Sequence, residues 1–169
     1  MFSALRALFH RRFPADTLYL AVVTKARQPD WFTRGAVPDT IDGRFDMVAL
    51  VFALVHRALE RDAASSAFLV SLTERFVDDM DESLRELGIG DMVIGKHVGR
   101  LMGALGGRLG AYRTALDTGE GLADVLTRNL YRGKVPTDAT LDWMVSAVTK
   151  LASDLDMMTA VDLRSGRLP

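Results

Sequence analysis

The stretch that decides the predicted fold is residues 74–116, ERFVDDMDESLRELGIGDMVIGKHVGRLMGALGGRLGAYRTAL. Apolar residues recur every three or four positions in its first half, which predicts an amphipathic helix with an acidic opposite face. Gly88 falls where a helix C-terminus favours glycine, and Asp91 falls where an N-cap belongs. The stretch therefore predicts two helices joined by a tight turn at residues 88–90.

The second of these helices has glycine at every fourth position: Gly95, Gly99, Gly103 and Gly107. A glycine in a helix costs about 1 kcal/mol of stability relative to alanine, so four on one face destabilise the helix considerably. We expect that face to pack closely against another backbone, as small residues do in membrane helix pairs. The sequence leaves open whether that backbone belongs to this chain or to another molecule. Basic side chains between the glycines argue against a membrane span.

The two helices carry opposite charge. Residues 74–91 hold seven acidic and two basic side chains, whereas residues 92–116 hold basic side chains and no acidic one. Either the two arms neutralise each other, or one arm meets a charged partner and steers the encounter. The residues that we expect at a partner interface are Asp78, Asp81, Glu82, Asp91, Lys96, Arg100, Arg108 and Tyr112.

Length and composition predict one globular domain. The chain has 169 residues, of which 49% are hydrophobic and 25% charged, with a net charge of −1. Such a balance favours no nucleic-acid partner. The chain has no cysteine, which excludes disulfides and thiol chemistry, and no apolar run of about 20 residues that would span a membrane. Because no secretory signal is recognisable at the start, we expect a cytoplasmic protein.

The rest of the chain predicts an all-α, single-domain bundle of about seven helices. A basic amphipathic segment, residues 1–13, precedes a helical domain, residues 14–153, and a C-terminal tail, residues 154–169, of which residues 162–169 are expected to be loose. The first segment is interpreted as a helix docked on the core, as an arm for a membrane surface or partner, or as a transit peptide. Further helices are expected at 16–27, 44–61 and 122–131 and from Asp138 onward, with a loop at 28–43 and Asp42 as a helix cap.

The sequence contains only partial matches to known ligand-binding and catalytic motifs. Residues 90–97 match most of a phosphate-binding loop, but His97 stands where a magnesium-binding Ser or Thr is needed. The acidic segment 78–82 resembles the Asp-rich helices that hold magnesium and diphosphate in isoprenoid enzymes, and only residues 138–142 offer a weak second segment. We therefore predict no catalytic residue, metal or cofactor. The alternative is a small isoprenoid- or lipid-binding protein, or a magnesium-dependent enzyme, that uses residues 78–82.

Three separated motifs carry a family resemblance. VPDTIDGRF at residues 37–45, the run from Asp79 to Tyr112, and RNLYRG at residues 128–133 resemble the ubiquinol–cytochrome c chaperone family, over roughly residues 15–150. One departure is Gly106, where family members usually carry an aromatic residue before the Gly-Arg pair.

The resemblance implies a non-enzymatic assembly factor for the cytochrome b subunit of ubiquinol–cytochrome c reductase. It implies binding to an apolar client segment of cytochrome b or another membrane protein. It also implies a small helical partner protein and the ribosome as further partners. Because the chain has no convincing transit peptide and no cysteine, we expect a bacterial protein with peripheral contact with the inner membrane.

Overall fold

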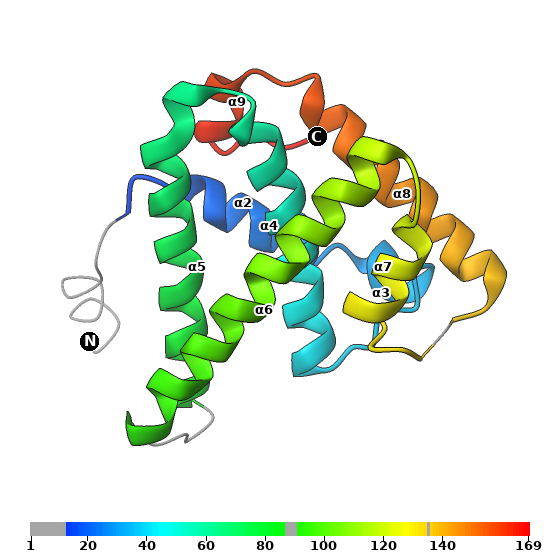
Figure 1. The fold of residues 1–169 in the computed structure, drawn as a ribbon, viewed down its shortest axis with the longest axis horizontal. Helices are drawn as coiled ribbons and strands as arrows, with labels where there is room; N and C mark the ends of the chain where they lie inside the picture. Colours follow the sequence, from blue (N-terminus) through cyan, green and yellow to red (C-terminus); the bar gives the residue numbers. More distant parts are fainter. Residues whose placement is uncertain (1–12, 87–90, 135) are drawn as a thin grey trace.

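The computed structural model describes residues 13–86, 91–134 and 136–169, with the backbone alone for residues 84–86, 91–98 and 100–102. The described residues form eight α-helices, one short 3-10 helix and no strand, which confirms the all-α prediction (Figure 1). The α-helices are α2 (Asp16–Ala26), α3 (Pro29–Thr33), α4 (Ile41–Glu60), α5 (Ser66–Glu86), α6 (Asp91–Thr118), α7 (Leu122–Asn129), α8 (Asp138–Asp156) and α9 (Ala160–Arg164), and the 3-10 helix is η1 (Ala63–Ser65).

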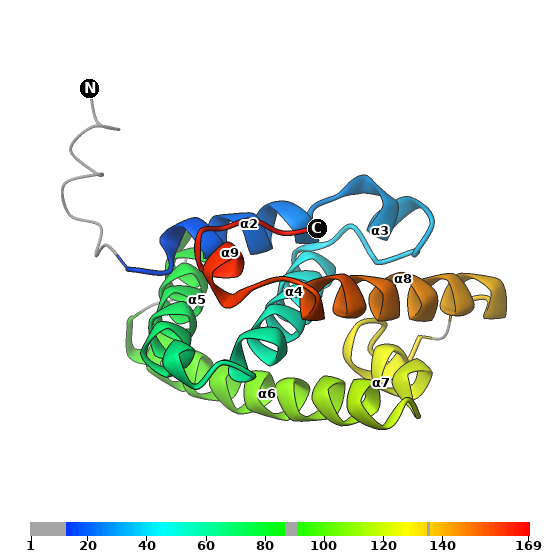
Figure 2. The ribbon, with the colours of Figure 1, turned by 90° about the horizontal axis from the view of Figure 1, so that it is seen from above.

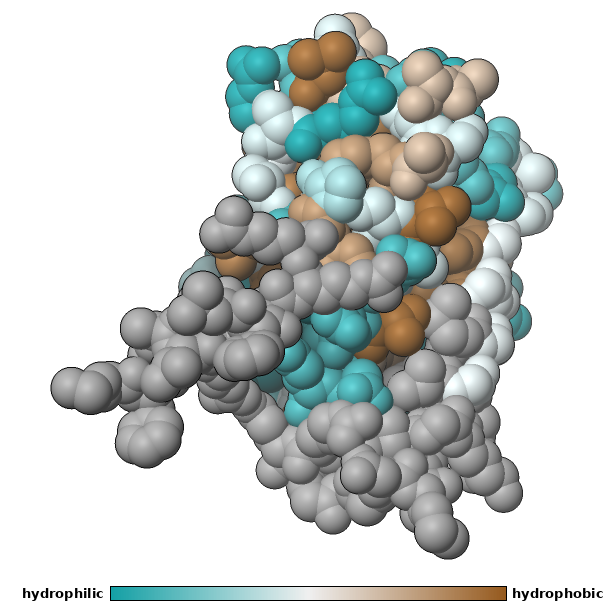
Figure 3. Space-filling view, turned by 90° about the vertical axis from the view of Figure 1, so that its left-hand side faces the viewer, coloured by the Kyte–Doolittle hydropathy of each residue, from teal (hydrophilic) through white to brown (hydrophobic). Residues whose placement is uncertain are grey.

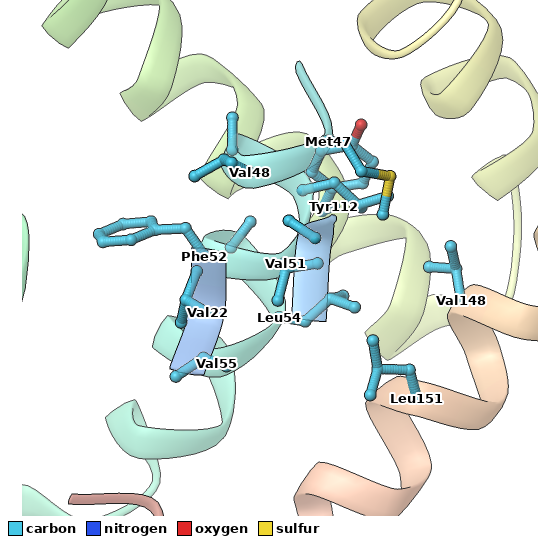
Figure 4. Close-up of a cluster of buried hydrophobic side chains, with 14 of the residues drawn as sticks. Val22, Met47, Val48, Val51, Phe52, Leu54, Val55, Tyr112, Val148 and Leu151 are labelled. Carbon is cyan, nitrogen blue, oxygen red and sulfur yellow. The ribbon is translucent and has the colours of Figure 1, made fainter. Parts of the chain in front are cut away.

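Helix α4 is the centre of the core. Its sequence is apolar around most of its circumference, which is typical of a buried helix, and it packs against α2, α5, α6, α8 and α9. Figure 2 shows α4 between α2 and α6. Side chains from three other helices meet it, including Val22 from α2, Tyr112 from α6 and Leu151 from α8 (Figure 4). Burial of this apolar surface is the main stabilising contribution to the fold.

The segment before α4 is more ordered than the predicted loop. It contains the short helix α3, and Trp31 of that helix is buried and donates from its indole Nε1 to the Lys25 carbonyl at 2.9 Å. The cap of α4 is Thr40, whose side chain accepts from the Gly43 amide at 3.1 Å, so the prediction of Asp42 as the cap is wrong. A threonine hydroxyl at this position can reach the third amide of the helix.

The two glycines of this segment are required by close contacts. A Cβ added to Gly43 would overlap the Pro38 carbonyl oxygen. A Cβ added to Gly35 would overlap the Met144 side chain and lie 2.5 Å from the Trp31 carbonyl oxygen. The chain can therefore turn into α4 only where no side chain intervenes.

The prediction of a loose C-terminal tail is wrong. Helix α8 extends to Asp156, and α9 follows, capped by Thr159, whose side chain accepts from the Asp162 amide at 3.1 Å. Leu163 of α9 is buried at 1% exposure, and α9 packs against α2 and α4. A single apolar side chain on a short helix gives a weak sequence pattern, so the docking was not predicted.

Candidate functional site

A buried carboxylate connects three parts of the chain. Asp46 on α4 is 1% exposed, and its Oδ1 lies 2.7 Å from Nη2 of Arg108 on α6. Its Oδ2 accepts from Nε of Arg132, just after α7, at 2.6 Å, and Arg132 also donates to the exposed Asp42. A buried charge is tolerable only when it is paired and hydrogen-bonded, and here two guanidinium groups fulfil that need. We call Asp46, Arg108 and Arg132 the Asp46 cluster.

Two aromatic side chains, Phe45 and Tyr112, lie near the cluster. The Arg108 guanidinium lies 5.3 Å from the centre of the Phe45 ring, a cation–π distance, and its side chain is 15% exposed. Tyr112, one turn further along α6, is 1% exposed, and burial raises the pKa of its hydroxyl. Among the described residues, neither Arg108 Nη1 nor the Tyr112 hydroxyl finds a hydrogen-bond partner. The side chain of Tyr112, a residue predicted at a partner interface, lies in the core of this structure.

The three motifs that carry the family resemblance meet at this cluster. Residues 37–45 end beside Asp46, the middle motif contributes Arg108, and residues 128–133 contribute Arg132. The Tyr131 hydroxyl of the third motif donates to the Gly35 carbonyl at 2.5 Å, which fixes the loop before α4. Asp46 is not among the residues predicted from the sequence. Its signal was a lone acid in the apolar run from Phe45 to Val55, since such an acid needs a buried partner.

The glycine row of α6 faces outward. Gly99, Gly103 and Gly107 are exposed, and a Cβ added to any of them would have no described heavy atom within 4 Å. Close packing of these three glycines inside the chain, one of the two predicted alternatives, is therefore wrong. The side-chain surroundings of Gly95 lie outside the described residues.

The geometry of the helix explains this outcome. Each residue turns about 100° around the axis, so positions four apart advance about 40° per step. The row that faces outward at Gly99 therefore turns into the core by Ala115, which is 4% exposed. The exposed side is continued by Gly106, which is likewise open within 4 Å. We call the exposed backbone at Gly99, Gly103, Gly106 and Gly107 the glycine edge.

Helix α6 is anchored from its other side. Leu105, Tyr112 and Ala115 are buried, and Arg108 holds the helix to Asp46. Figure 2 shows α6 along one side of the molecule, with α4 between it and α2. One side of the helix is thus held firmly while the glycine edge presents bare backbone.

The acidic arm contacts α2 and is partly neutralised by its own Arg75. Asp79 accepts from the Tyr19 hydroxyl at 2.8 Å and lies 3.5 Å from Arg75, whose Nε is 3.2 Å from Asp16. The predicted interface residues Asp78, Asp81 and Glu82 are half-buried on α5. The side chains of Asp91, Lys96 and Arg100 lie outside the described residues, so neutralisation across the two arms stays a prediction.

Helices α4 and α5 also form an apolar groove with an acidic rim. Its volume is about 430 Å³, and we call it the α5 groove. The residues that line it are Phe13, His56, Leu69, Val70, Thr73, Glu74, Val77 and Asp78. Figure 3 views the side on which α5 lies in Figure 1 and shows apolar surface interspersed with hydrophilic surface. Among the described residues, no group of three or more His, Cys, Asp or Glu side chains could hold a metal ion.

His56 makes stability depend on pH. Its Nδ1 lies 3.4 Å from Glu60, but burial lowers the pKa of His56 below its ordinary value of 6.5, against the opposing effect of Glu60. The unfolded chain therefore binds more protons than the folded chain as pH falls below that value, and stability is lost. We expect His56→Gln to lose less unfolding free energy than wild type between about pH 7.5 and pH 5, measured by urea denaturation. Equal losses in both proteins would contradict this cause.

The fold and its surface define a class: an all-helical domain whose most unusual surface is an exposed stretch of helix backbone. In the part of the chain that the structure describes, no helix is long and apolar enough to cross a membrane. The family model for ubiquinol–cytochrome c chaperones matches residues 33–168, and the chain belongs to this family. The family prediction from the three motifs is thereby confirmed.

A solved structure agrees with this assignment. The crystal structure of the Cbp3 homolog from Brucella abortus is 32% identical to this chain. The match covers 92% of this chain and 87% of that chain, with a TM-score of 0.79. No curated protein sequence matches significantly.

Proposed function

We propose that the chain is a non-enzymatic assembly chaperone for the cytochrome b subunit of ubiquinol–cytochrome c reductase. The observation that carries the proposal is the glycine edge of α6, which has no described neighbour within 4 Å. Glycines lower the stability of a helix. For an exposed row of glycines, a close contact with another molecule would offset that loss. Membership of the chaperone family supports the identity of the client.

The proposed binding mode depends on bare backbone. An apolar helix of the client can approach α6 more closely at Gly103 than at any position with a side chain, which increases van der Waals contact and shields the client from water. The acidic residues Asp81 and Glu82 on α5, and the basic residues Lys96 and Arg100 on α6, orient the client or a small helical partner. The chain acts in the cytoplasm of a bacterium, at the surface of the inner membrane and near the ribosome.

Gly103→Leu tests the glycine edge. A leucine there adds a bulky side chain at the proposed contact, while the open space around Gly103 leaves the fold intact. We expect about tenfold less cytochrome b to copurify with the tagged variant from cells, which corresponds to the cost of inserting a side chain into a packed contact. Crosslinking in intact cells, followed by identification of the attached chains, checks the client directly.

The matched control is Thr149→Leu, which adds the same kind of apolar surface at an exposed position on α8. It should retain normal copurification. Equal recovery of cytochrome b with both variants would remove the glycine edge from the proposal. The charged arms are tested by reversing Lys96 and Arg100 only, because reversal of Arg108 would break the Asp46 cluster and confuse folding with binding.

A further inference from the structure

The α5 groove has an apolar floor and an acidic rim. Leu69 is buried at its base, Val77 is half-buried, and Val70 is 60% exposed. Glu74 and Asp78 lie on the same face of α5, one helical turn apart. None of the α6 side chains that the structure describes lines the groove, and none of the glycines of the glycine edge does. Its volume of about 430 Å³ is sufficient for several apolar side chains.

The chemistry of the groove complements one segment of this chain. Residues 2–12, FSALRALFHRR, contain three arginines and no acid. Their apolar residues Phe2, Leu5 and Phe9 recur at helical spacing, so a helix would place them on one side. An apolar side would match the floor formed by Leu69 and Val77, and the arginines would match the acidic rim.

The position of residues 2–12 in the chain also favours them as the occupant of the α5 groove. Phe13 directly follows the segment, is 7% exposed and itself lines the groove. From Leu69 to Asp78 the groove extends nine residues along α5, or about 14 Å, and eleven residues in a helix extend about 17 Å. Because the segment is tethered at the groove, its effective concentration is in the millimolar range, and a weak contact is enough to keep it bound.

We propose that the α5 groove is the docking site of the chain's own basic amphipathic segment, residues 2–12. The apolar side of the segment covers Val70 and Val77, and its arginines lie along Glu74 and Asp78. The groove then recognises basic amphipathic helices as a chemical class, and the segment is its intramolecular ligand. This inference does not depend on the proposed client.

A single thiol tests the docking. The chain has no cysteine, so Val70→Cys in the full-length protein carries the only thiol. We expect N-ethylmaleimide to modify it about tenfold faster when Leu5, Leu8 and Phe9 are all replaced by serine, because a segment bound about 90% of the time blocks access for that fraction. Asp78→Lys, with the segment intact, should accelerate the reaction in the same direction.

Leu20→Cys is the matched control. Leu20 lies on α2, does not line the groove and is 67% exposed, close to the value for Val70. Its reaction rate should be the same with the intact and the serine-substituted segment, because Leu20 lies away from the groove. Equal rates at Val70→Cys in both backgrounds would overturn the proposal. Protection that increases with protein concentration would also overturn it, because the groove would then bind a segment from a second copy.

Discussion

Asp46→Asn is expected to lower the free energy of unfolding by about 3 kcal/mol, the lower end of the cost of removing one partner of a buried ion pair. The substitution leaves Arg108, which is 15% exposed, without its carboxylate partner. Arg132 loses the same partner but is 47% exposed and keeps Asp42, so it contributes less to the loss. Urea denaturation followed by circular dichroism measures the change.

Asp42→Asn is the control for this prediction. Asp42 also pairs with Arg132, but its side chain is 69% exposed, so we expect a loss below about 1 kcal/mol. If Asp46→Asn cost no more than Asp42→Asn, the Asp46 cluster would not be a significant source of stability. Combining Asp46→Asn with Arg108→Met separates the charge effect from lost packing, since the double variant should be destabilised by less than the sum of the two single changes.

Gly43→Ala and Gly103→Ala are expected to change stability in opposite directions. At Gly43 the new methyl group would overlap the Pro38 carbonyl oxygen, so the first turn of α4 or the preceding loop has to move, at a cost of about 1–3 kcal/mol. At Gly103 nothing described lies within 4 Å, so alanine should contribute its better helix propensity, up to about 1 kcal/mol. Thermal and urea denaturation of both variants measure the two shifts.

A stabilising effect of Gly43→Ala would contradict the close contact with Pro38. A destabilising effect of Gly103→Ala would indicate that this glycine is already packed in the isolated chain. The Gly103 result also has a functional consequence. If alanine stabilises the chain but weakens copurification of cytochrome b, then glycine at that position is retained for binding and not for folding.

Helix positions were predictable because their signals are local. The apolar residues of α2, α4, α6 and α8 recur at helical spacing within a few turns of one another, so the sequence alone located these helices. The burial of α4 was predictable for the same reason, since it is apolar nearly all round. The short helices α3 and α9 were missed because five residues are too few to show a period.

The Asp46 cluster was not predictable from local pattern. Arg132 is 86 positions from Asp46 along the chain, and nothing near Asp46 indicates which arginine it meets. The family resemblance selected the segments that contribute to the cluster, because its three motifs contain or adjoin the paired residues. It did not indicate that their role is to hold α4, α6 and the end of α7 together. That role follows only from the distances between side chains.

The sequence by itself determined the class of fold, the central helix and the membership of the chaperone family, because periodicity and motifs are properties of neighbouring residues. Only the tertiary structure decided which glycines are crowded and which are open. Gly43 is in close contact with Pro38. Gly103, in a row that was predicted to pack against another backbone, faces outward. The reason is that the sequence specifies how residues are arranged around each helix axis, but the packing of α6 on α4 sets which side of that axis faces the core.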